Sequence, residues 1–251
     1  MKISIVTACF NAAATLPSTL ESVAAQTWRD FEHVIVDGGS TDGTLDVVAA
    51  WTRHPVHLVR GPDRGIYDAM NKGIAASTGD VIGFLNADDR YADADALRAI
   101  AEALADDAPD FVHGDLVFVD PAQRRVLRYW KGAPFDHARF ALGFLPAHPT
   151  LYVRRAAFEA TGPFSLAYGT AGDVEWMIRL LARPALRSVY IPRVLVEMNA
   201  GGVSNATWGA WLRANGHVWR ACARLGVRPA PFVIGKTLRK LPQWLRRRLA
   251  A

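Results

Sequence analysis

Blocks of apolar and mixed residues alternate along roughly the first half of the chain, and they predict strands and helices in turn. Short apolar runs predict buried strands at Ile3–Ala8, His33–Asp37, Val56–Arg60, Val81–Leu85 and Phe111–Val119. Between them, apolar residues recur every three or four positions, which predicts helices at Thr15–Gln26, Leu45–Trp51, Ile66–Ser77 and Ala94–Leu104. This alternation over short turns indicates βαβ units and an α/β fold with a mixed, mostly parallel sheet flanked by helices.

The pattern is looser in the second half of the chain. Strands are predicted at Val126–Trp130, Thr150–Val153, Ser188–Ile191 and Val194–Met198, and helices at Arg155–Ala160, Val174–Leu181 and Trp208–Leu225. The last of these helices is amphipathic. The proline-containing stretch Arg228–Pro231 is expected to break the chain before a final basic segment.

Composition narrows the class of protein. The chain has 251 residues, 51% of them apolar, so one large domain with a substantial core is expected. Cys9 and Cys222 make no disulfide framework and suit a reducing, cytoplasmic compartment. The first apolar run is short and leads directly into a helical pattern, which favours a buried strand over a signal peptide. No uncharged apolar stretch reaches the ~18 residues that a membrane span requires.

Charge is distributed unevenly along the chain. Residues 1–197 carry 19 basic and 24 acidic side chains, a net charge of −5. Residues 198–251 carry ten basic side chains and no acidic ones. We therefore expect an acidic, enzyme-like domain over residues 1–205 and a basic, amphipathic helical extension over residues 206–251.

The first candidate site is the loop Val36–Thr44, in which Asp37 ends a predicted strand. Its glycines allow close backbone approach, and Ser40, Thr41 and Asp42 are suited to cap the next helix. An ordinary strand–turn–helix connection is the alternative interpretation. The loop lacks the lysine of a phosphate-binding P-loop and the spacing of a dinucleotide-binding fingerprint.

The second candidate site is the loop Phe84–Asp89, in which Asp88 and Asp89 follow a predicted strand. Carboxylates at the carboxyl ends of adjacent parallel strands point into one crevice, where they repel one another. A divalent cation and a nucleotide diphosphate would relieve that repulsion, and hard oxygen ligands suit Mg²⁺ or Mn²⁺. Helix capping by adjacent acids is the alternative for this loop alone. Together the two loops indicate a nucleotide-sugar enzyme.

Five segments, taken in order, resemble the inverting family-2 glycosyltransferases with the GT-A fold. They are Ser4–Asn11, Val36–Thr44, Asp63–Gly73, Gly79–Asp89 and Ala171–Trp176. The resemblance spans roughly residues 3–205, and its third segment is the most specific. That segment is similar to the subgroup that assembles bacterial exopolysaccharide, O-antigen and glycolipid glycans. The resemblance thus implies a cell-envelope glycosyltransferase domain.

The resemblance implies a nucleotide-sugar donor, in the first place a UDP-sugar, and a hydroxyl acceptor on a lipid-linked glycan. It assigns nucleoside contacts to Thr7, Asn11 and Asp37, base or phosphate contacts to Asp63 and Arg64, and the metal motif to Asn86 and Asp88. Asp88 is the favoured ligand of Mg²⁺ or Mn²⁺, and Asp89 is a second ligand or a helix cap. Asn86 stands where the family frequently has an aspartate. An asparagine is a poorer metal ligand but still bonds a ribose hydroxyl.

The resemblance makes Asp173 the candidate general base. Inversion requires the acceptor hydroxyl to lose a proton as it attacks the anomeric carbon, and a carboxylate within hydrogen-bond reach takes that proton. Gly172 occupies the position where the family commonly has an acid, and Glu175 is the alternative base. A helix N-cap is the structural alternative for Asp173, and the two roles are compatible.

Other residues of the resemblance have weaker assignments. His148 is expected either to orient acceptor or donor phosphate or to be structural. Tyr67 and Asp68 are expected to shape the donor pocket, although Asp68 also fits a helix surface. The glycine-rich stretch Met198–Asn205 is expected either to close over the diphosphate or to be a plain linker.

The basic extension interleaves tryptophans and arginines, as an interfacial membrane anchor does. Packing or oligomer contact with a solvated charged face is the alternative, and nothing else in the chain indicates nucleic acid. We expect a cytoplasmic enzyme that lies peripherally on the inner face of the membrane.

Two other classes of protein remain open at this stage. A nucleotidyltransferase would share the nucleotide-binding sheet and the carboxylate-held metal. However, it would be expected to carry a basic, glycine-rich phosphate loop after the first strand, where none is visible. A non-catalytic protein that keeps the fold would bind nucleotide sugars without turnover.

Overall fold

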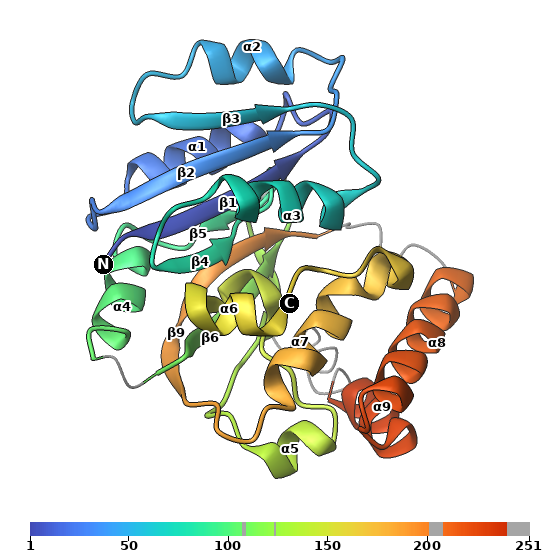
Figure 1. Ribbon diagram of the computed structural model, residues 1–251. Coiled ribbons are helices and arrows are strands. Elements are labelled where there is room, and N and C mark those ends of the chain that lie inside the picture. The colour runs from blue at the N-terminus through green and yellow to red at the C-terminus, as the bar shows by residue number, and fades with distance from the viewer. Residues whose placement is uncertain (107–108, 123, 201–207, 240–251) are drawn as a thin grey trace.

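A computed structural model describes residues 1–106, 109–122, 124–200 and 208–239. Figure 1 shows its strands: β1 (Ile3–Cys9), β2 (Phe31–Asp37), β3 (Val56–Arg60), β4 (Val81–Phe84), β5 (Arg90–Tyr91), β6 (Phe111–Val119), β7 (Val126–Trp130), β8 (Tyr152–Arg154) and β9 (Ser188–Asn199). The helices are α1 (Leu16–Ala24), α2 (Thr44–Ala49), α3 (Ile66–Ala76), α4 (Ala96–Ala103), α5 (His137–Ala141), α6 (Arg155–Thr161), α7 (Gly172–Leu181), α8 (Trp208–Arg224) and α9 (Pro229–Leu238). Two 3₁₀ segments are η1 (His148–Thr150) and η2 (Leu166–Ala171).

The described strands form one sheet in the order β3-β2-β1-β4-β8-β6-β9-β5, with β7 paired to β6. The pairs from β3 to β4 are parallel, and β1 is buried along almost its whole length, as expected for a strand covered by helices on both faces. The next strand, β8, runs antiparallel to both β4 and β6. The predicted α/β class with a mixed sheet is confirmed.

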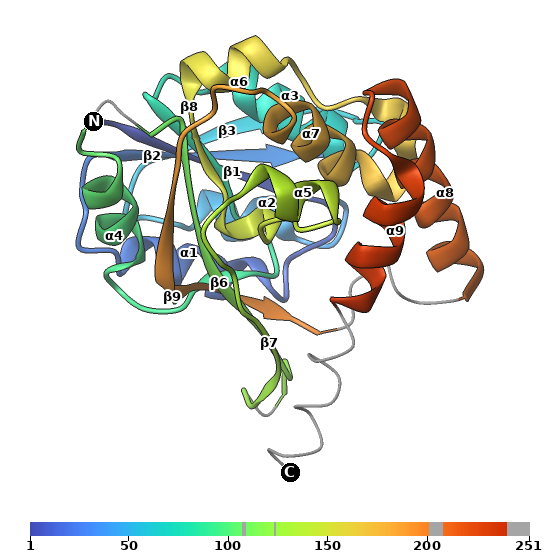
Figure 2. The same ribbon diagram turned by 90° about the horizontal axis from the view of Figure 1, so that it is seen from below.

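Helices cover both faces of the sheet. In Figure 2, α1 and α4 lie on one side of it, and α3, α6 and α7 lie on the other. The helices α8 and α9 lie beside α7 (Figure 1), and they contribute to the larger core cluster. Val218, Ala221, Cys222 and Phe232 are each at most 1% exposed. The basic end of the chain therefore buries an apolar face against the rest of the molecule.

The sequence prediction did not include β5 and α5, and two proline-containing segments differ from it. The two short strands expected on either side of Pro192 are one continuous strand, β9. Its pairing with β6 shifts register between Ile191 and Val194, where the proline cannot donate a hydrogen bond. The stretch expected to break the chain begins α9 instead, with Pro229 in the first turn. Proline suits this place because the first turn of a helix needs no internal N–H bond.

Candidate functional site

The first acidic loop lies where β1 and β2 end side by side, with Cys9 opposite Asp37 in the register. Asp37 is only 1% exposed, and its Oδ1 accepts hydrogen bonds from the backbone N–H groups of Gly39 and Ser40, each at 3.0 Å. Its Oδ2 lies 3.8 Å from the thiol of Cys9. One oxygen of Asp37 thus shapes the loop, and the other faces Cys9.

The end of β1 is tied to this loop through Asn11. Its side-chain oxygen accepts a bond of 2.9 Å from the N–H of Thr41, and its own N–H donates to Ser40 Oγ at 2.8 Å. Asn11 adopts a φ of +50°, which asparagine tolerates better than most residues. These contacts hold the predicted nucleoside residues Asn11 and Asp37 against one another.

The segment after β3 closes onto the same loop. Asp63 leans over Gly38 so closely that a Cβ at Gly38 would lie 2.3 Å from Asp63 Oδ2, so only glycine fits there. Asp63 Oδ1 accepts the N–H of Gly65, whose φ of +107° begins α3. Arg64 projects outward, 78% exposed, and pairs with Asp68 at 3.0 Å. The structure thus brings Asp63 to the first loop and leaves Arg64 at the surface.

Thr7 is fully buried, and its hydroxyl is engaged within the protein. It donates to the carbonyl oxygen of Leu85 at 2.6 Å and lies 2.9 Å from His33 Nε2. His33 Nδ1 in turn lies 3.0 Å from His54 Nε2. The Thr7 side chain therefore links β1 to the strand that carries the second acidic loop.

The second acidic loop holds two adjacent carboxylates in different environments. The Asp88 side chain is exposed, whereas Asp89 is 1% exposed. Partial desolvation by the surrounding loop raises the pKa of the Asp88 carboxyl, and burial together with the charge of Asp88 raises the pKa of Asp89 well above its usual range. Asn86 Nδ2 donates to Asp89 Oδ2 at 3.2 Å. The backbone oxygen of Asp88 accepts a bond of 2.8 Å from Asn199 at the end of β9.

The donor set of this loop fits a divalent cation that is shared with a phosphate. Among the described residues, Asn86 Oδ1 and Asp89 Oδ1 are buried oxygens without a hydrogen-bond partner. Such oxygens are costly to bury unless a proton or a cation satisfies them. Within the same part of the chain, no three His, Cys, Asp or Glu side chains gather closely enough to hold an ion by themselves. Phosphate and water oxygens would therefore have to complete the coordination.

Asp173 lies in the first turn of α7, and its Oδ1 accepts a hydrogen bond of 2.9 Å from the hydroxyl of Tyr67 on α3. Burial and the charge of Asp173 both raise the pKa of Tyr67, so Tyr67 remains a donor. The Tyr67 ring also fills the space beside Gly172, where a Cβ would lie 2.7 Å from ring carbons. This close approach explains why glycine replaces the acid that the family commonly has at this position.

Glu175, the alternative base, is committed to a structural ion pair. It is 4% exposed, and its two oxygens accept bonds of 2.7 and 3.0 Å from Arg179 on the next turn. Arg179 also donates to the carbonyl oxygens of Thr161 and Pro163. This network fastens α7 to the end of α6.

His148 lies in η1, stacked on Phe84 at the end of β4 with 5.2 Å between ring centroids. It is 8% exposed, and its Nε2 has no hydrogen-bond partner among the described residues. Burial lowers the pKa of His148, and the charge of Asp173 acts in the opposite direction. His148 is therefore a buried imidazole within electrostatic reach of Asp173.

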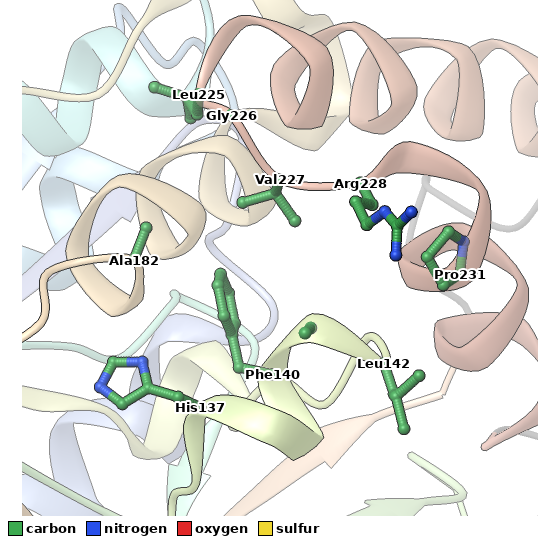
Figure 3. A pocket seen from close by; sticks show the side chains of 10 residues that line it. His137, Phe140, Leu142, Ala182, Leu225, Gly226, Val227, Arg228 and Pro231 are labelled. Carbon is green, nitrogen blue, oxygen red and sulfur yellow. The ribbon is translucent and has the colours of Figure 1, made fainter.

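Figure 3 shows a cavity of about 430 Å³ elsewhere in the molecule. It is lined by residues of α5, of the turn between α8 and α9, and of the position after α7. Phe140, Val227 and Arg228 are among them. None of the predicted site residues lines this cavity. The candidate site is instead the group of loops at the carboxyl ends of β1, β2 and β4, together with the start of α7.

Comparison with known proteins identifies the family. Residues 4–159 match the family model described as glycosyl transferase family 2. The chain belongs to glycosyltransferase family 2. It is 39% identical over 208 residues to a protein of Mycobacterium tuberculosis (strain H37Ra) named PGL/p-HBAD biosynthesis glycosyltransferase, covering 80% of this chain and 78% of the relative. A protein of the same name from Mycobacterium bovis BCG gives the same values.

Solved structures show the same fold at low sequence identity. Staphylococcus aureus TarS (residues 1–349) in complex with UDP-GlcNAc aligns with a TM-score of 0.71 and 16% identity, over 98% of this chain and 79% of that one. The mannosyltransferase PcManGT from Pyrobaculum calidifontis, in complex with GDP-Man and Mn²⁺, gives 0.68 and 20%, over 99% and 74%. The GT-A fold expected of this family-2 glycosyltransferase is thereby confirmed.

Some features of this glycosyltransferase were not accessible from its sequence. Burial lowers the pKa of Lys236 on α9, and the charge of Asp173 on α7 acts to raise it, although the two residues are far apart in the chain. No motif marks Lys236, because α9 carries no part of the family resemblance. Asn71, within the most specific segment, bonds both backbone groups of Phe164 at 2.9 Å, so part of that segment serves packing.

Some sequence predictions fall outside the described residues. Residues 201–205 of the predicted closing loop, and Trp244 and residues 246–248 of the basic extension, are not described. Among the helices that are described, none combines the length and apolar character needed to cross a bilayer.

Proposed function

We propose that this glycosyltransferase moves a sugar from a nucleotide-diphosphate sugar, in the first place a UDP-sugar, to a hydroxyl acceptor with inversion, using Mg²⁺ or Mn²⁺. The observation that carries the proposal is the pair of carboxylates Asp88 and Asp89 after β4, where Asp89 Oδ1 and the neighbouring Asn86 Oδ1 are buried without a hydrogen-bond partner among the described residues. A bound cation would offset the charge that builds on the leaving diphosphate. Structural neighbours in complex with UDP-GlcNAc, UDP, or GDP-Man with Mn²⁺ support this reading.

On this proposal, the first loop binds the nucleoside and the start of α7 activates the acceptor. Asn11, Asp37 and Asp63 are held together around Gly38 and form the nucleoside side of the crevice. Asp173 is the base, because its carboxylate is positioned by Tyr67, whereas Glu175 is occupied by Arg179. The acceptor hydroxyl gives its proton to Asp173 as its oxygen attacks the anomeric carbon, and the diphosphate leaves with the bonding electron pair.

A glycolipid or lipid-linked glycan is the proposed acceptor, and the relatives named for PGL/p-HBAD biosynthesis support it. The outer surfaces of α8 and α9 support docking on an anionic membrane at the cytoplasmic face. Their exposed apolar residues are Leu212, Trp219, Ile234 and Leu238. Exposed arginines on α8 accompany them: Arg213, Arg220 and Arg224.

A panel of nucleotide sugars, each tested with and without Mn²⁺, tests the donor proposal. A ligand present at 100 times its Kd stabilises the native state by about 2.7 kcal/mol, which shifts the Tm of a chain of this size by several degrees. The stabilising donor is then incubated with a glycolipid acceptor, and the anomeric configuration of the product is read by NMR. A retained configuration, or no stabilisation by any nucleotide sugar, would refute the proposal.

Flotation with anionic liposomes tests the membrane proposal. Arg213→Glu is expected to weaken liposome binding roughly thirtyfold, because each basic residue near an anionic surface contributes about 1 kcal/mol and charge reversal doubles the loss to about 2 kcal/mol. Arg98→Glu on α4, which lies across the molecule from α8 in Figure 1, is the matched control. Equal loss with both variants would show that the outer face of α8 is not the docking surface.

A further inference from the structure

The most specific segment of the sequence contains an asparagine that has no place in the proposed chemistry. Asn71 lies on α3, and its side-chain amide joins that helix to the loop between α6 and η2. Its Nδ2 donates to the carbonyl oxygen of Phe164 at 2.9 Å, and its Oδ1 accepts the N–H of Phe164, also at 2.9 Å. One amide thus satisfies both backbone groups of a residue 93 positions away that belongs to no helix or strand.

These two bonds fix the place of the Phe164 ring. Phe164 is 2% exposed, and its ring stacks on that of Tyr67 with 5.6 Å between centroids and 30° between planes. Tyr67 lies one turn before Asn71, so α3 holds Phe164 by its backbone on one turn and contacts its ring on the other. Phe84 and Trp176 enclose the same ring, with centroids at 5.3 and 5.2 Å, which leaves it little freedom.

Tyr67 is held on its other side by the start of α7. A Cβ at Gly172 would lie 2.7 Å from carbons of the Tyr67 ring, so the ring rests directly on the backbone there. The Tyr67 hydroxyl donates to Asp173 Oδ1 at 2.9 Å and lies 3.3 Å from the carbonyl oxygen of Thr170. A phenol has one proton to donate, so a small shift of the ring decides between the carboxylate and the carbonyl.

The bond from Tyr67 engages one oxygen of Asp173. Asp173 is half-buried in the first turn of α7, and Tyr67 is the one described side chain that donates to it, on Oδ1. Holding Oδ1 fixes the direction of Oδ2, and a general base must lie about 2.6–3.2 Å from the oxygen whose proton it takes. A displacement of about 1 Å is enough to cost on the order of 10²-fold in rate.

We infer that Asn71 is a positioning residue of the transferase. By holding Phe164 against Tyr67, it keeps the phenol on the carboxylate of the base, whose other oxygen then faces the acceptor. This inference rests on the proposed base role of Asp173. It also gives α3 a place in both halves of the site, because Asp63 at the start of the helix meets the first acidic loop.

Asn71→Ala tests this inference on full-length protein with a detergent-solubilised acceptor. It is expected to lower kcat about tenfold, a partial displacement of the base, and to leave the KM of the nucleotide sugar within about twofold of the wild type. Gln26→Ala is the matched control, because α1, which precedes Gln26, lies on the opposite side of the sheet from α3 (Figure 2). The Gln26 amide likewise bonds backbone groups distant from it, those of Ser22, Asp93 and Leu97. Gln26→Ala should lower stability and keep kcat per folded molecule.

A second measurement asks whether Asn71 acts through the base. Without the carboxylate of Asp173 there is no base to position, so Asn71→Ala should change the residual single-turnover rate of Asp173→Asn by less than about twofold. Tyr67→Phe keeps the ring and removes the hydroxyl, so it should lower kcat as Asn71→Ala does. The variant with both changes should lie within about twofold of either alone, since the two side chains act in series.

The outcomes separate the inference from the proposed function. Wild-type turnover by Asp173→Asn would remove the proposed base, and the inference with it. If Asp173→Asn is inactive, the inference alone is overturned by an unchanged kcat in Asn71→Ala, by a loss that Gln26→Ala matches, or by a loss that persists undiminished in the Asp173→Asn background. Asn71→Asp still accepts the N–H of Phe164. It replaces the alanine variant if that variant loses the native circular dichroism spectrum, and it must show the same dependence on Asp173.

Discussion

At the scale of single residues, Asp173 and Glu175 lie two positions apart on α7 and have opposite surroundings. Asp173 accepts one side-chain hydrogen bond from the described residues, that of Tyr67, whereas Glu175 is buried and accepts two bonds from Arg179. We expect Asp173→Asn to lower kcat by ~10²-fold or more with little change in stability, the usual size of a general base effect. Single-turnover transfer and urea unfolding measure the two effects.

Glu175→Gln is expected to show the reverse behaviour. Breaking one side of a buried ion pair costs about 3 kcal/mol, because Arg179 is left without its carboxylate. Turnover per folded molecule should stay near that of the wild type. The role assignment fails if Glu175→Gln is stable but inactive while Asp173→Asn remains active.

The proposed metal dependence requires the carboxylate of Asp88. Its exposed carboxylate and the buried Asp89 repel one another, and a cation would relieve that repulsion. We expect chelation to abolish transfer and added Mn²⁺ or Mg²⁺ to restore it. We expect Asp88→Ala to lower transfer ~10²-fold or more at any metal concentration. Full activity after exhaustive chelation, confirmed by elemental analysis, would argue against a metal.

The lowered pKa of Glu32 predicts that the free energy of unfolding falls in acid, an effect that is separate from catalysis. Burial alone would raise the pKa of Glu32, but hydrogen bonds from Lys2, Ser4 and Thr78 outweigh it and lower the pKa to about 2. A lowered pKa adds stability that is present above the unfolded-state value, near 4.5, and is lost as pH falls towards about 2. Glu32→Gln should flatten this part of the profile of unfolding free energy against pH.

The control for Glu32 is Glu102→Gln, at an exposed position on α4. It should leave the acid profile unchanged when unfolding is followed by urea titration at several pH values. Parallel profiles for wild type and Glu32→Gln between about pH 2 and 4.5 would contradict the assignment.

The sequence predicted several residues that lie near one another in the structure, and the roles that it assigned to them stay predictions. Asn11, Asp37 and Asp63 were expected together and lie together, since strand ends and the family motif both mark them. Thr7 was expected to face the nucleoside, but its hydroxyl bonds Leu85 and contacts His33. Side-chain direction at a strand end depends on partners that are distant in the chain, and a motif does not record them.

At the scale of elements, the packing of α9 against the end of α5 depends on Gly235, which a sequence pattern would interpret as a helix breaker. Gly235→Ala places a Cβ 2.0 Å from the Leu142 carbonyl oxygen, so it is expected to destabilise the protein by about 1–3 kcal/mol. Gly216→Ala on α8 meets no atom within 4 Å and should stabilise by about 0.5–1 kcal/mol. Thermal and urea unfolding compare the two. Similar effects of the same sign would show that α9 is not seated against α5.

Two of the elements that the sequence prediction placed wrongly contain a proline. Helix α9 begins at Pro229, and a proline gives the same local signal whether it starts a helix or ends one. Strand β9 passes through Pro192 because β6 shifts register there, which is a property of the partner strand. Regular elements with strong periodicity, such as α3 and β6, were placed within a residue of their observed bounds.

At the scale of the whole molecule, the charge asymmetry of the sequence does not coincide with the layout of the core. The basic helices α8 and α9 place Val218, Ala221 and Phe232 in the same cluster as Trp176 of α7. Helices α8 and α9 thus present a basic outer surface and pack their apolar inner face against the rest of the core.

This arrangement predicts the effect of truncation after residue 205. Burying Val218 and Phe232 contributes about 1.5–3 kcal/mol each, so losing both removes about 3–6 kcal/mol, which reaches the lower end of the net stability of many domains, about 5–15 kcal/mol. We expect the truncated chain to lose its near-ultraviolet circular dichroism and to bind a hydrophobic dye, whereas the full-length chain unfolds in a single transition. Removal of residues 240–251 alone spares α9 and is the control. If residues 1–205 alone keep a wild-type Tm, α8 and α9 do not contribute to the stability of the core.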